Sequence, residues 1–266
     1  DAAGSAGLGP GEAVALSTLS SEFLDQVFTV KEAEKALKMK GGRLRKLLFD
    51  LAESRWIERI ERGKYLLIPL EAGPGASYGT HPFIYARKLA NPYYIGFASA
   101  LNYYGMTEQV SRITYIVTTK QKKPLRFHAQ RYQFVRLDGK RFFGFEEEWL
   151  GRVTFRISDR EKTVVDCLFM PGYSGGISEV AKALKEKLDI GKLCGYALGM
   201  EDMATVKRLG YLLDKLGADR AAMKKLLPKV GGGYCLLDTA GPKTGTRNKK
   251  WKVIENIDMN GFGAES

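Results

Sequence analysis

Two short segments near the N-terminus combine basic side chains with glycine in a way that could bind phosphate groups. The first runs from Lys40 to Lys46, and the second surrounds Gly63. Lysine and arginine neutralise phosphates and read base edges, and glycine lets a phosphate approach bare backbone N–H groups. The candidate DNA contacts are Lys40, Gly42, Arg43, Arg45, Lys46, Arg62 and Lys64.

The charge of the whole chain also favours an anionic partner. Its 266 residues carry 42 Lys or Arg against 30 Asp or Glu, a formal net charge of +12. Residues 28–64 hold 11 basic and 6 acidic side chains, and residues 81–160 hold 14 basic and 6 acidic. A field of this sign attracts polyanions such as nucleic acid. A surface that only keeps the protein in solution is the alternative for the second of these regions.

The first basic segment opens an expected helix over residues 43–54. Four leucines repeat at the spacing of a core-facing stripe, namely Leu44, Leu47, Leu48 and Leu51. Lys46 lies opposite that stripe with Phe49 and Glu53, and Arg43 and Arg45 flank it. The basic side chains therefore occupy the N-terminal half of the solvent face. This arrangement is typical of a helix that enters the major groove of DNA.

The neighbouring elements complete a winged helix-turn-helix over residues 16–70. Two helices are expected upstream, one over residues 16–27 and one that Thr29 caps. Downstream, residues 57–60 and 65–68 read as two short strands joined by a basic turn that contains glycine. The alternative is a winged helix that serves only for dimerisation or protein docking.

The rest of the chain predicts an α+β fold, with strands followed by a helical bundle. Residues 1–15 read as a disordered tail, and residues 71–81 as a linker rich in Gly, Pro and Ser. Residues 82–266 form the second domain. Its strands are expected at 113–119, 131–137 and 153–157, and its helices within 92–105, from Ser158 to Met170, and at about 178–188, 191–198 and 204–216.

No pattern in the chain favours an enzyme. A nucleotidyltransferase needs Gly-Ser followed by a pair of metal-binding acids, and no such pair follows Gly4-Ser5. Asp138-Gly-Lys140 matches half of a metal-dependent nuclease motif, but it lies in a turn without well-placed upstream acids. Phosphate-binding-loop, zinc-protease and serine-hydrolase motifs are missing from the sequence.

No cofactor is expected either, and the compartment is expected to be the cytoplasm. Cys167, Cys194 and Cys235 are widely spaced in apolar surroundings, which favours neither a disulfide framework nor a zinc site. No apolar run is long enough to span a bilayer, and the first residues lack the pattern of a signal peptide. We therefore expect no membrane partner.

A second set of residues forms a candidate surface for an interaction partner, namely Arg126, Arg131, Arg136, Arg160, Lys162 and Asp166. Because strands alternate faces, the first three arginines cannot all share one face. Asp166 lies among apolar residues and four positions after Lys162. A network of charges that holds the start of a helix on the sheet is therefore the alternative for the last three.

Several motifs in chain order carry a resemblance to a known family. They are Arg62-Gly-Lys-Tyr65, Tyr94-Ile-Gly-Phe-Ala-Ser-Ala-Leu-Asn-Tyr-Tyr-Gly-Met106, Ile157-Ser-Asp-Arg-Glu-Lys-Thr-Val-Val-Asp-Cys-Leu168, Gly175-Gly-Ile-Ser-Glu179, Lys207-Arg-Leu-Gly-Tyr-Leu-Leu213 and Trp251-Lys-Val-Ile-Glu-Asn256. Over about residues 20–257 the chain resembles the AbiEi antitoxins of type IV toxin–antitoxin and phage-defence systems. One departure is Lys162-Thr163, where the family has Arg-Thr. Lysine keeps the charge but loses the bidentate fork of a guanidinium.

The resemblance implies two activities. The N-terminal domain would repress its own operon by binding inverted repeats in double-stranded DNA. The C-terminal domain would counteract a co-encoded nucleotidyltransferase toxin, in many family members without a tight complex. Two alternatives stay open: a module that binds the toxin or its RNA substrate directly, and a winged-helix regulator that senses a ligand.

Overall fold

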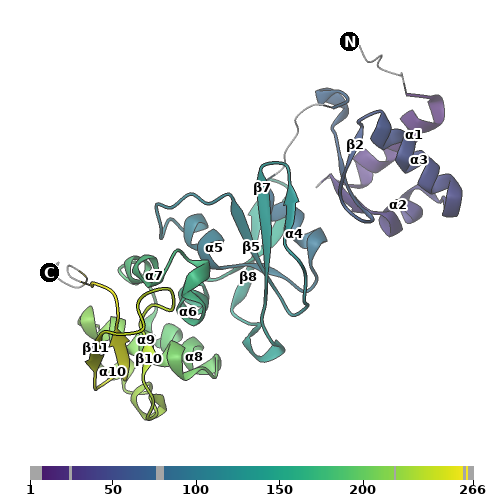
Figure 1. The fold of residues 1–266 in the computed structure, drawn as a ribbon. Helices are drawn as coiled ribbons and strands as arrows, with labels where there is room; N and C mark the ends of the chain where they lie inside the picture. The colour runs from purple at the N-terminus through teal and green to yellow at the C-terminus, as the bar shows by residue number, and fades with distance from the viewer. Residues whose placement is uncertain (1–7, 24–25, 76–80, 219, 260–261, 263–266) are drawn as a thin grey trace. The chain divides into compact units, whose positions relative to one another are not determined.

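The chain folds into two compact units (Figure 1). The computed structural model describes residues 8–23, 26–75, 81–218, 220–259 and 262. Unit 1 comprises residues 1–91 with 149–155, and unit 2 comprises residues 92–148 with 156–266. The fold is α+β, as predicted, with a winged helix first and then strands followed by helices. No helix in the described part is long and apolar enough to cross a membrane.

The N-terminal part of unit 1 has the element order of a winged helix. Its three strands form an antiparallel sheet in the order β1-β3-β2, and β2 and β3 form the wing. The elements are α1 (Pro10–Glu22), β1 (Val27–Thr29), α2 (Val30–Leu37), α3 (Gly41–Glu53), β2 (Ile57–Glu61) and β3 (Lys64–Leu67). This confirms the predicted helices around α2 and α3 and the predicted hairpin.

Local signals explain where the helices begin. Thr29 caps α2: its hydroxyl accepts the Glu32 N–H at 3.2 Å, and the Glu32 carboxylate accepts the Thr29 N–H at 2.8 Å. The apolar faces then meet in one core, which packs Leu16 and Leu19 of α1 against Leu44, Leu48 and Leu51 of α3. Burial of these leucines supplies the main force that holds the helices together.

The first helix differs from the prediction at both ends. It begins at Pro10 rather than at residue 16, so residues 10–15 are helical and not part of a disordered tail. Proline suits the first turn of a helix, and the Glu12 carboxylate accepts the Gly9 N–H at 2.9 Å. At the other end the helix stops at Glu22, because residues 27–29 pair with β3 as strand β1. Residues 1–7 of the expected tail lie outside the described residues.

The expected linker, residues 71–81, is described in part. The short 3-10 turn η1 (Leu70–Ala72) overlaps the start of this segment, and residues 76–80 lie outside the described residues. Helix α4 (Pro82–Leu89) follows and groups with unit 1. Within this unit, Lys88 of α4 forms an ion pair with Glu32 of α2.

The sheet that follows has six strands in the order β6-β7-β5-β4-β9-β8. It is mixed, since β5 runs parallel to β7 and antiparallel to β4. The elements are β4 (Tyr94–Ile95), α5 (Phe97–Tyr103), β5 (Ile113–Thr118), β6 (Leu125–Phe127), β7 (Gln130–Arg136), the 3-10 turn η2 (Gly139–Arg141), β8 (Phe145–Leu150) and β9 (Val153–Ser158). The sequence predicted β5, β7 and β9, and it missed the short strands β4 and β6 and the strand β8.

A helical bundle completes the core of unit 2. It comprises α6 (Arg160–Phe169), the 3-10 turn η3 (Pro171–Tyr173), α7 (Ile177–Ala183), α8 (Ile190–Gly199), α9 (Met203–Lys215), α10 (Arg220–Met223) and the 3-10 turn η4 (Leu227–Lys229). The first of these helices begins at Arg160 and not at Ser158 as expected, and Asp159 is its N-cap. The Asp159 carboxylate accepts the Lys162 N–H at 2.8 Å, as an N-cap does.

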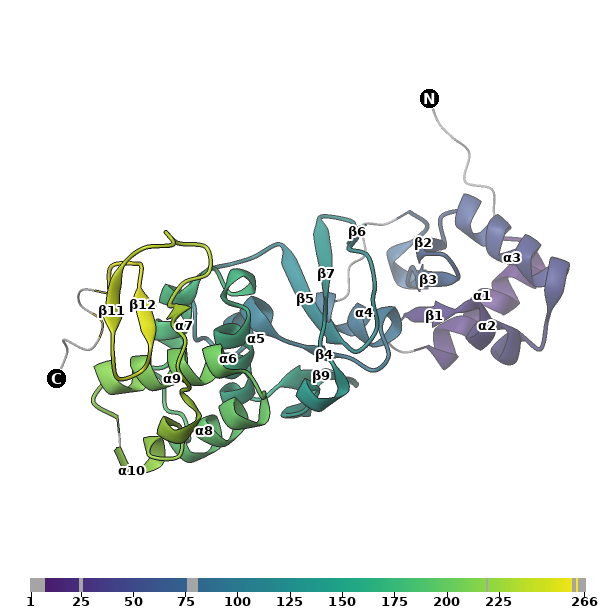
Figure 2. The same ribbon diagram turned by 60° about the horizontal axis from the view of Figure 1, so that its bottom comes forward.

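A small C-terminal sheet was not expected from the sequence. It consists of β10 (Cys235–Leu236), β11 (Thr246–Asn248) and β12 (Val253–Glu255), and it lies beside α9 (Figure 2). The fully buried Trp251 anchors it, with its ring against Gly210 of α9. A Cβ on Gly210 would come within 2.1 Å of that ring, so only glycine allows this approach.

Candidate nucleic-acid interface

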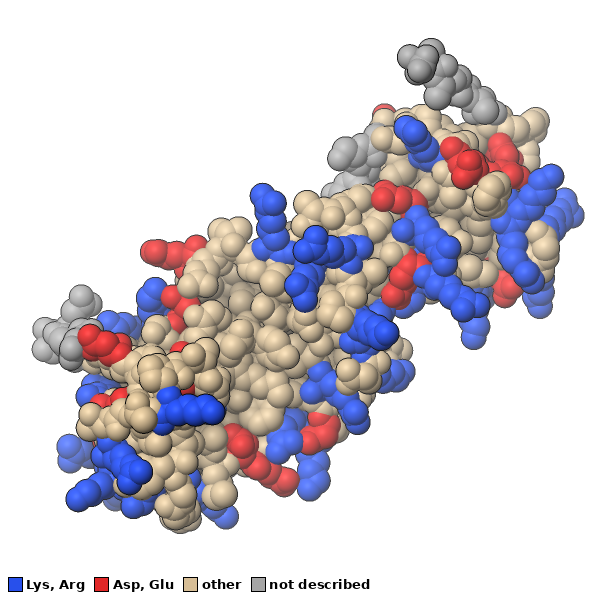
Figure 3. Space-filling view, viewed as in Figure 1, with Lys and Arg blue, Asp and Glu red and all other residues tan. Residues whose placement is uncertain are grey.

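Helix α3 presents one apolar face and one basic face. Leu44, Leu48 and Leu51 are buried in the core of the winged helix, while Arg43, Arg45 and Lys46 are exposed. Figure 3 shows basic side chains gathered where α2 meets α3. The leucine spacing predicted this division.

The availability of the basic side chains on α3 depends on whether acids pair with them. Among the described residues, none of Arg43, Arg45 and Lys46 forms an ion pair. The acids of the helix, Asp50 and Glu53, lie in its C-terminal half. Three cations on one face are therefore available to an external anion.

An exposed aromatic ring extends the same face. Phe49 follows Lys46 by three positions, which places the two side chains side by side on the helix. Its side chain is 63% exposed, and it stands out because α3 otherwise buries its large apolar groups. Such a ring offers an apolar contact next to the basic groups.

The turn before α3 leaves its first backbone N–H groups accessible. Lys38 has a left-handed conformation with φ 51°. Lys40 occupies the N-cap position of α3, but its side chain makes no hydrogen bond to the backbone N–H groups of the first turn. Gly41 has φ +67°, a region that favours glycine, and a Cβ on Gly41 or Gly42 would meet no atom within 4 Å. An anion could therefore approach the positive end of this helix closely.

The wing places its two predicted contacts differently. Arg62 is exposed at the tip, next to Gly63, whose φ is +77°. Lys64 is only partly exposed, and its ammonium lies 2.7 Å from Glu61 and 3.4 Å from the Leu89 carbonyl oxygen. Glu61 and Lys64 are cross-strand partners in the hairpin, which explains this pairing. Arg62 is thus the more available cation.

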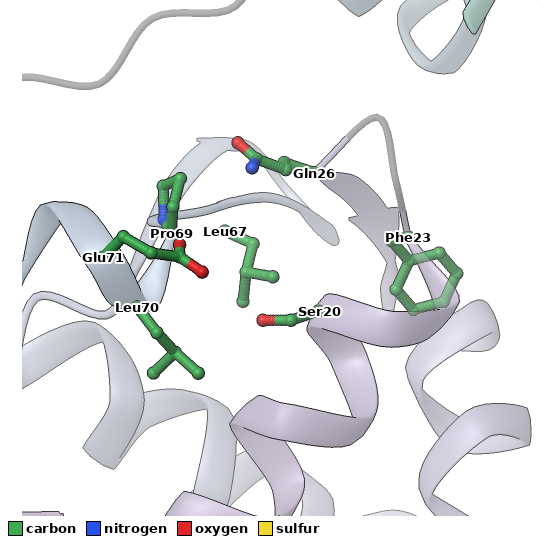
Figure 4. Close-up of a pocket in the computed structure, with 7 residues that line it drawn as sticks. All are labelled: Ser20, Phe23, Gln26, Leu67, Pro69, Leu70 and Glu71. Carbon is green, nitrogen blue, oxygen red and sulfur yellow. The ribbon is translucent and has the colours of Figure 1, made fainter. Parts of the chain in front are cut away.

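A small cavity elsewhere in the winged helix does not suit an anion. It has a volume of about 180 Å³ and lies between the end of α1 and the end of β3 (Figure 4). Ser20, Gln26 and Glu71 are among the residues that line it, and the lining contains no basic side chain. Its one charged residue is acidic and would repel phosphate.

In unit 2, the arginines of the predicted interaction surface divide between two faces. Arg126 and Arg131 are exposed and stand directly opposite each other on β6 and β7. Arg136 is also exposed, but its odd spacing from Arg131 puts it on the other face of β7. Arg160 lies 3.7 Å from Glu186 in a partly exposed ion pair.

The prediction that Lys162 and Asp166 lie on this surface is wrong. Both side chains are completely buried and form an ion pair with each other. The Tyr94 hydroxyl donates to Asp166 Oδ2 at 2.8 Å and accepts from Lys162 Nζ at 3.2 Å. Burial raises the pKa of Asp166, and Lys162 opposes that rise. A charge buried in the core needs such partners, so the pair supports the fold rather than a partner surface.

A second charged network surrounds the start of α6. Lys192 of α8 lies 3.2 Å from Asp159 and 2.9 Å from Glu161, and the Tyr196 hydroxyl donates to Asp159 at 2.9 Å. Burial alone would raise the pKa of Glu161. The hydrogen bonds from Lys192 and from the Asp189 N–H outweigh burial, so the pKa lies below its ordinary value. This network joins α6 to α8. The contact between α6 and the sheet, which the sequence offered as the alternative, is made instead by Lys162 and Asp166 with Tyr94 of β4, and Arg160 pairs separately with Glu186.

Sequence reasoning had no means of finding Tyr94 as the partner of Lys162 and Asp166. Tyr94 is 68 residues from Lys162 and 72 residues from Asp166 in the sequence, and only the packing of β4 against α6 unites them.

The three cysteines are free. Among the described residues, no group of three or more His, Cys, Asp or Glu could hold a metal ion.

The fold therefore defines an α+β protein with an N-terminal winged helix. No protein-family model matches the chain, and no curated protein matches it. Among solved structures, the crystal structure of the Rv2827c protein from Mycobacterium tuberculosis is similar to it, with a TM-score of 0.63 and 16% sequence identity. The similarity covers 91% of each chain and shows a shared fold.

Proposed function

We propose that the chain is a DNA-binding antitoxin that represses its own operon, with the winged helix as the DNA-binding domain. The observation that carries the DNA-binding part is the unpaired basic face of α3, with Arg43, Arg45 and Lys46 exposed around a glycine-rich start. A winged helix commonly inserts this helix into the major groove. The +12 charge of the chain supports the same partner.

Each basic residue has an expected role in this complex. Lys46 and Arg43 point away from the core at the N-terminal half of α3 and would read base edges. Arg45, Lys40 and the N–H groups near Gly42 would hold phosphates, which position the protein without reading sequence. Arg62 would contact the backbone or the minor groove from the wing.

Phe49 would add an apolar contact to the base contacts that Lys46 and Arg43 make with the DNA. In the major groove only thymine presents a methyl group, and an aromatic ring is a suitable partner for it. Because Phe49 lies beside Lys46 and is 63% exposed, it would reach a base pair next to the one that Lys46 contacts. We therefore assign to Phe49 a preference for thymine in the half-site.

The antitoxin part of the proposal rests on the resemblance to the AbiEi family. The motifs around Tyr94 and Asp166, which carry much of that resemblance, form the buried network of unit 2. The partner would be a co-encoded nucleotidyltransferase toxin, and the cell compartment would be the cytoplasm. Stable co-elution with the product of the neighbouring gene would instead favour direct binding of the toxin.

Fluorescence anisotropy with the DNA upstream of the gene tests the DNA-binding part. A scrambled duplex of equal length and a salt series provide the comparison. We expect a preference of about a thousandfold or more for the upstream DNA at physiological salt. About six phosphate contacts would give a slope of log K against log salt of about −5. Equal binding to both duplexes would contradict the repressor role.

A variant of α3 locates the interface. Lys46→Ala should weaken binding to the upstream DNA more than to the scrambled duplex, because Lys46 reads bases. Lys187→Ala, which removes one exposed positive charge from unit 2, is the matched control and should change neither. Equal losses of affinity for both duplexes in Lys46→Ala would show that Lys46 does not contact base edges in the major groove.

A further inference from the structure

Two arginines on neighbouring strands of unit 2 stand directly opposite each other. Arg126 of β6 and Arg131 of β7 are directly opposed in the antiparallel register, so their side chains share one face of the sheet. Side chains in this relationship start about 5 Å apart at Cβ, and like charges opposite each other destabilise the pair of strands. Something other than fold stability must account for this pair.

In the part of the chain that the structure describes, the pair has no acidic partner. Within the described residues neither arginine forms an ion pair, and the one side-chain partner of Arg131 is the neutral Gln133, at 3.3 Å. Residues 109–137 contain seven lysines or arginines and no acid. Arg112 is also exposed. It lies next to Arg131, because its carbonyl oxygen accepts the Arg131 N–H at 3.0 Å. Basic side chains lie over this part of the sheet in Figure 3.

Two tyrosines lie on the same face as the arginine pair. Tyr115 of β5 is the register partner of Gln133, which shares the face of Arg131. Its ring packs against that of Tyr173, with 5.5 Å between the centroids. Both rings are partly exposed, and among the described residues neither phenol oxygen has a hydrogen-bond partner.

Val117 and Val135, farther along the same face, are buried in the core, so only the part of the face near the arginine pair is accessible. We propose that this accessible part, formed by Arg126, Arg131 and Tyr115 with Tyr173 beside it, binds single-stranded RNA. The guanidinium groups of Arg126 and Arg131 would hold a phosphate of the backbone between them, which relieves their repulsion. The tyrosine phenols would donate hydrogen bonds to 2′-hydroxyls, and their rings would contact unstacked bases. In duplex DNA the bases are stacked on one another and cannot reach such rings, so a single strand fits this surface better.

The inference is independent of DNA binding by the winged helix, because it uses residues of unit 2 alone. The probe is a fluorescent RNA of about 12 nucleotides, a common length for such sites. Anisotropy of the full chain should show binding that weakens about tenfold or more in the double variant Arg126→Gln/Arg131→Gln. Arg136→Gln is the matched control, an exposed arginine on the opposite face of β7, and should leave RNA affinity within about twofold.

Two further measurements separate this site from the winged helix and from loss of fold. Lys46→Ala should keep RNA binding, and the double arginine variant should keep binding of the upstream DNA. The melting temperature of the double variant should equal or exceed that of the parent, because two like charges are removed from opposite positions. RNA affinity unchanged in the double variant, or lost equally in Arg136→Gln or Lys46→Ala, would overturn the proposal. An absence of RNA binding by the parent chain would overturn it too.

Discussion

The Tyr94 hydroxyl donates a 2.8 Å hydrogen bond to the Asp166 carboxylate, although the two residues are 72 positions apart. Lys162 completes the group from one turn earlier on α6, and all three side chains are fully buried. The network joins the short strand β4 to the first helix of the bundle. In this network the single ammonium of Lys162 serves both Asp166 and Tyr94.

Removing the lysine should destabilise the protein strongly. In Lys162→Met the Asp166 carboxylate would stay buried without its cation, which costs about 3–5 kcal/mol of the free energy of unfolding. Urea unfolding followed by circular dichroism measures this loss. Lys162→Met/Asp166→Leu should recover much of it, since no charge remains buried in that variant.

An exposed ion pair on the same helix provides the control. Arg160→Ala removes the partly exposed pair with Glu186, and such pairs contribute about 0–1 kcal/mol. If Lys162→Met lost no more than Arg160→Ala, the buried network would not be a structural element.

The thymine preference assigned to Phe49 can be tested on both partners. Replacing thymine by deoxyuridine in one half-site removes only methyl groups, so we expect the parent chain to lose about fourfold in affinity per contacted methyl. Phe49→Ala should bind the two DNAs equally, and Phe49→Leu should retain part of the difference. Anisotropy titrations of the three proteins against both duplexes give the comparison. An equal effect of deoxyuridine on the parent and on Phe49→Ala would place the ring away from the methyl.

The two wing residues should differ in their effect on DNA binding. Arg62 is exposed, whereas Lys64 is held by Glu61 and by the Leu89 carbonyl oxygen. Arg62→Ala should weaken binding to all duplexes about equally and make the slope of log K against log salt shallower by about 1. Lys64→Ala should have a smaller effect on both quantities. A larger loss in Lys64→Ala would mean that its ion pair opens when DNA binds.

The acid stability of the protein should depend on Glu161. Its pKa in the folded protein is below the ordinary value of 4.5, because the hydrogen bonds from Lys192 and the Asp189 N–H outweigh the effect of burial. A lowered pKa stabilises the fold above the unfolded value and loses that contribution as pH falls through the folded value. Urea midpoints should therefore decline below about pH 4.5, and Glu161→Gln should show a shallower decline.

Glu186→Gln is the control for this acid dependence, because Glu186 is exposed and its ion pair with Arg160 is longer. Its curve should follow that of the parent chain. Parallel curves for the parent and for Glu161→Gln would show that other carboxyls cause the acid loss, among them Glu32, Glu179 and Asp214, whose pKa values are also lowered by their partners.

The sequence by itself determined α2, α3, the hairpin of β2 and β3, and the exposure of the basic face, but it did not give strand β1 or the ends of α1. The Thr29 and Glu32 capping box, the leucine spacing of α3 and the glycine turn of the wing are local patterns, and each formed as predicted. Local patterns are reliable here because they depend on hydrogen bonds and side-chain spacing within one helix or hairpin.

Only the tertiary structure decided which charged residues are exposed in unit 2. The sequence left open whether Lys162 and Asp166 lie on the surface or in a network at the start of a helix, and the packing of β4 against α6 buries them with Tyr94. The opposition of Arg126 and Arg131 likewise depends on the register between β6 and β7, which a shift of one residue would abolish. Burial and strand register are set by contacts between distant segments, so they follow from the packed fold rather than from any local run of residues.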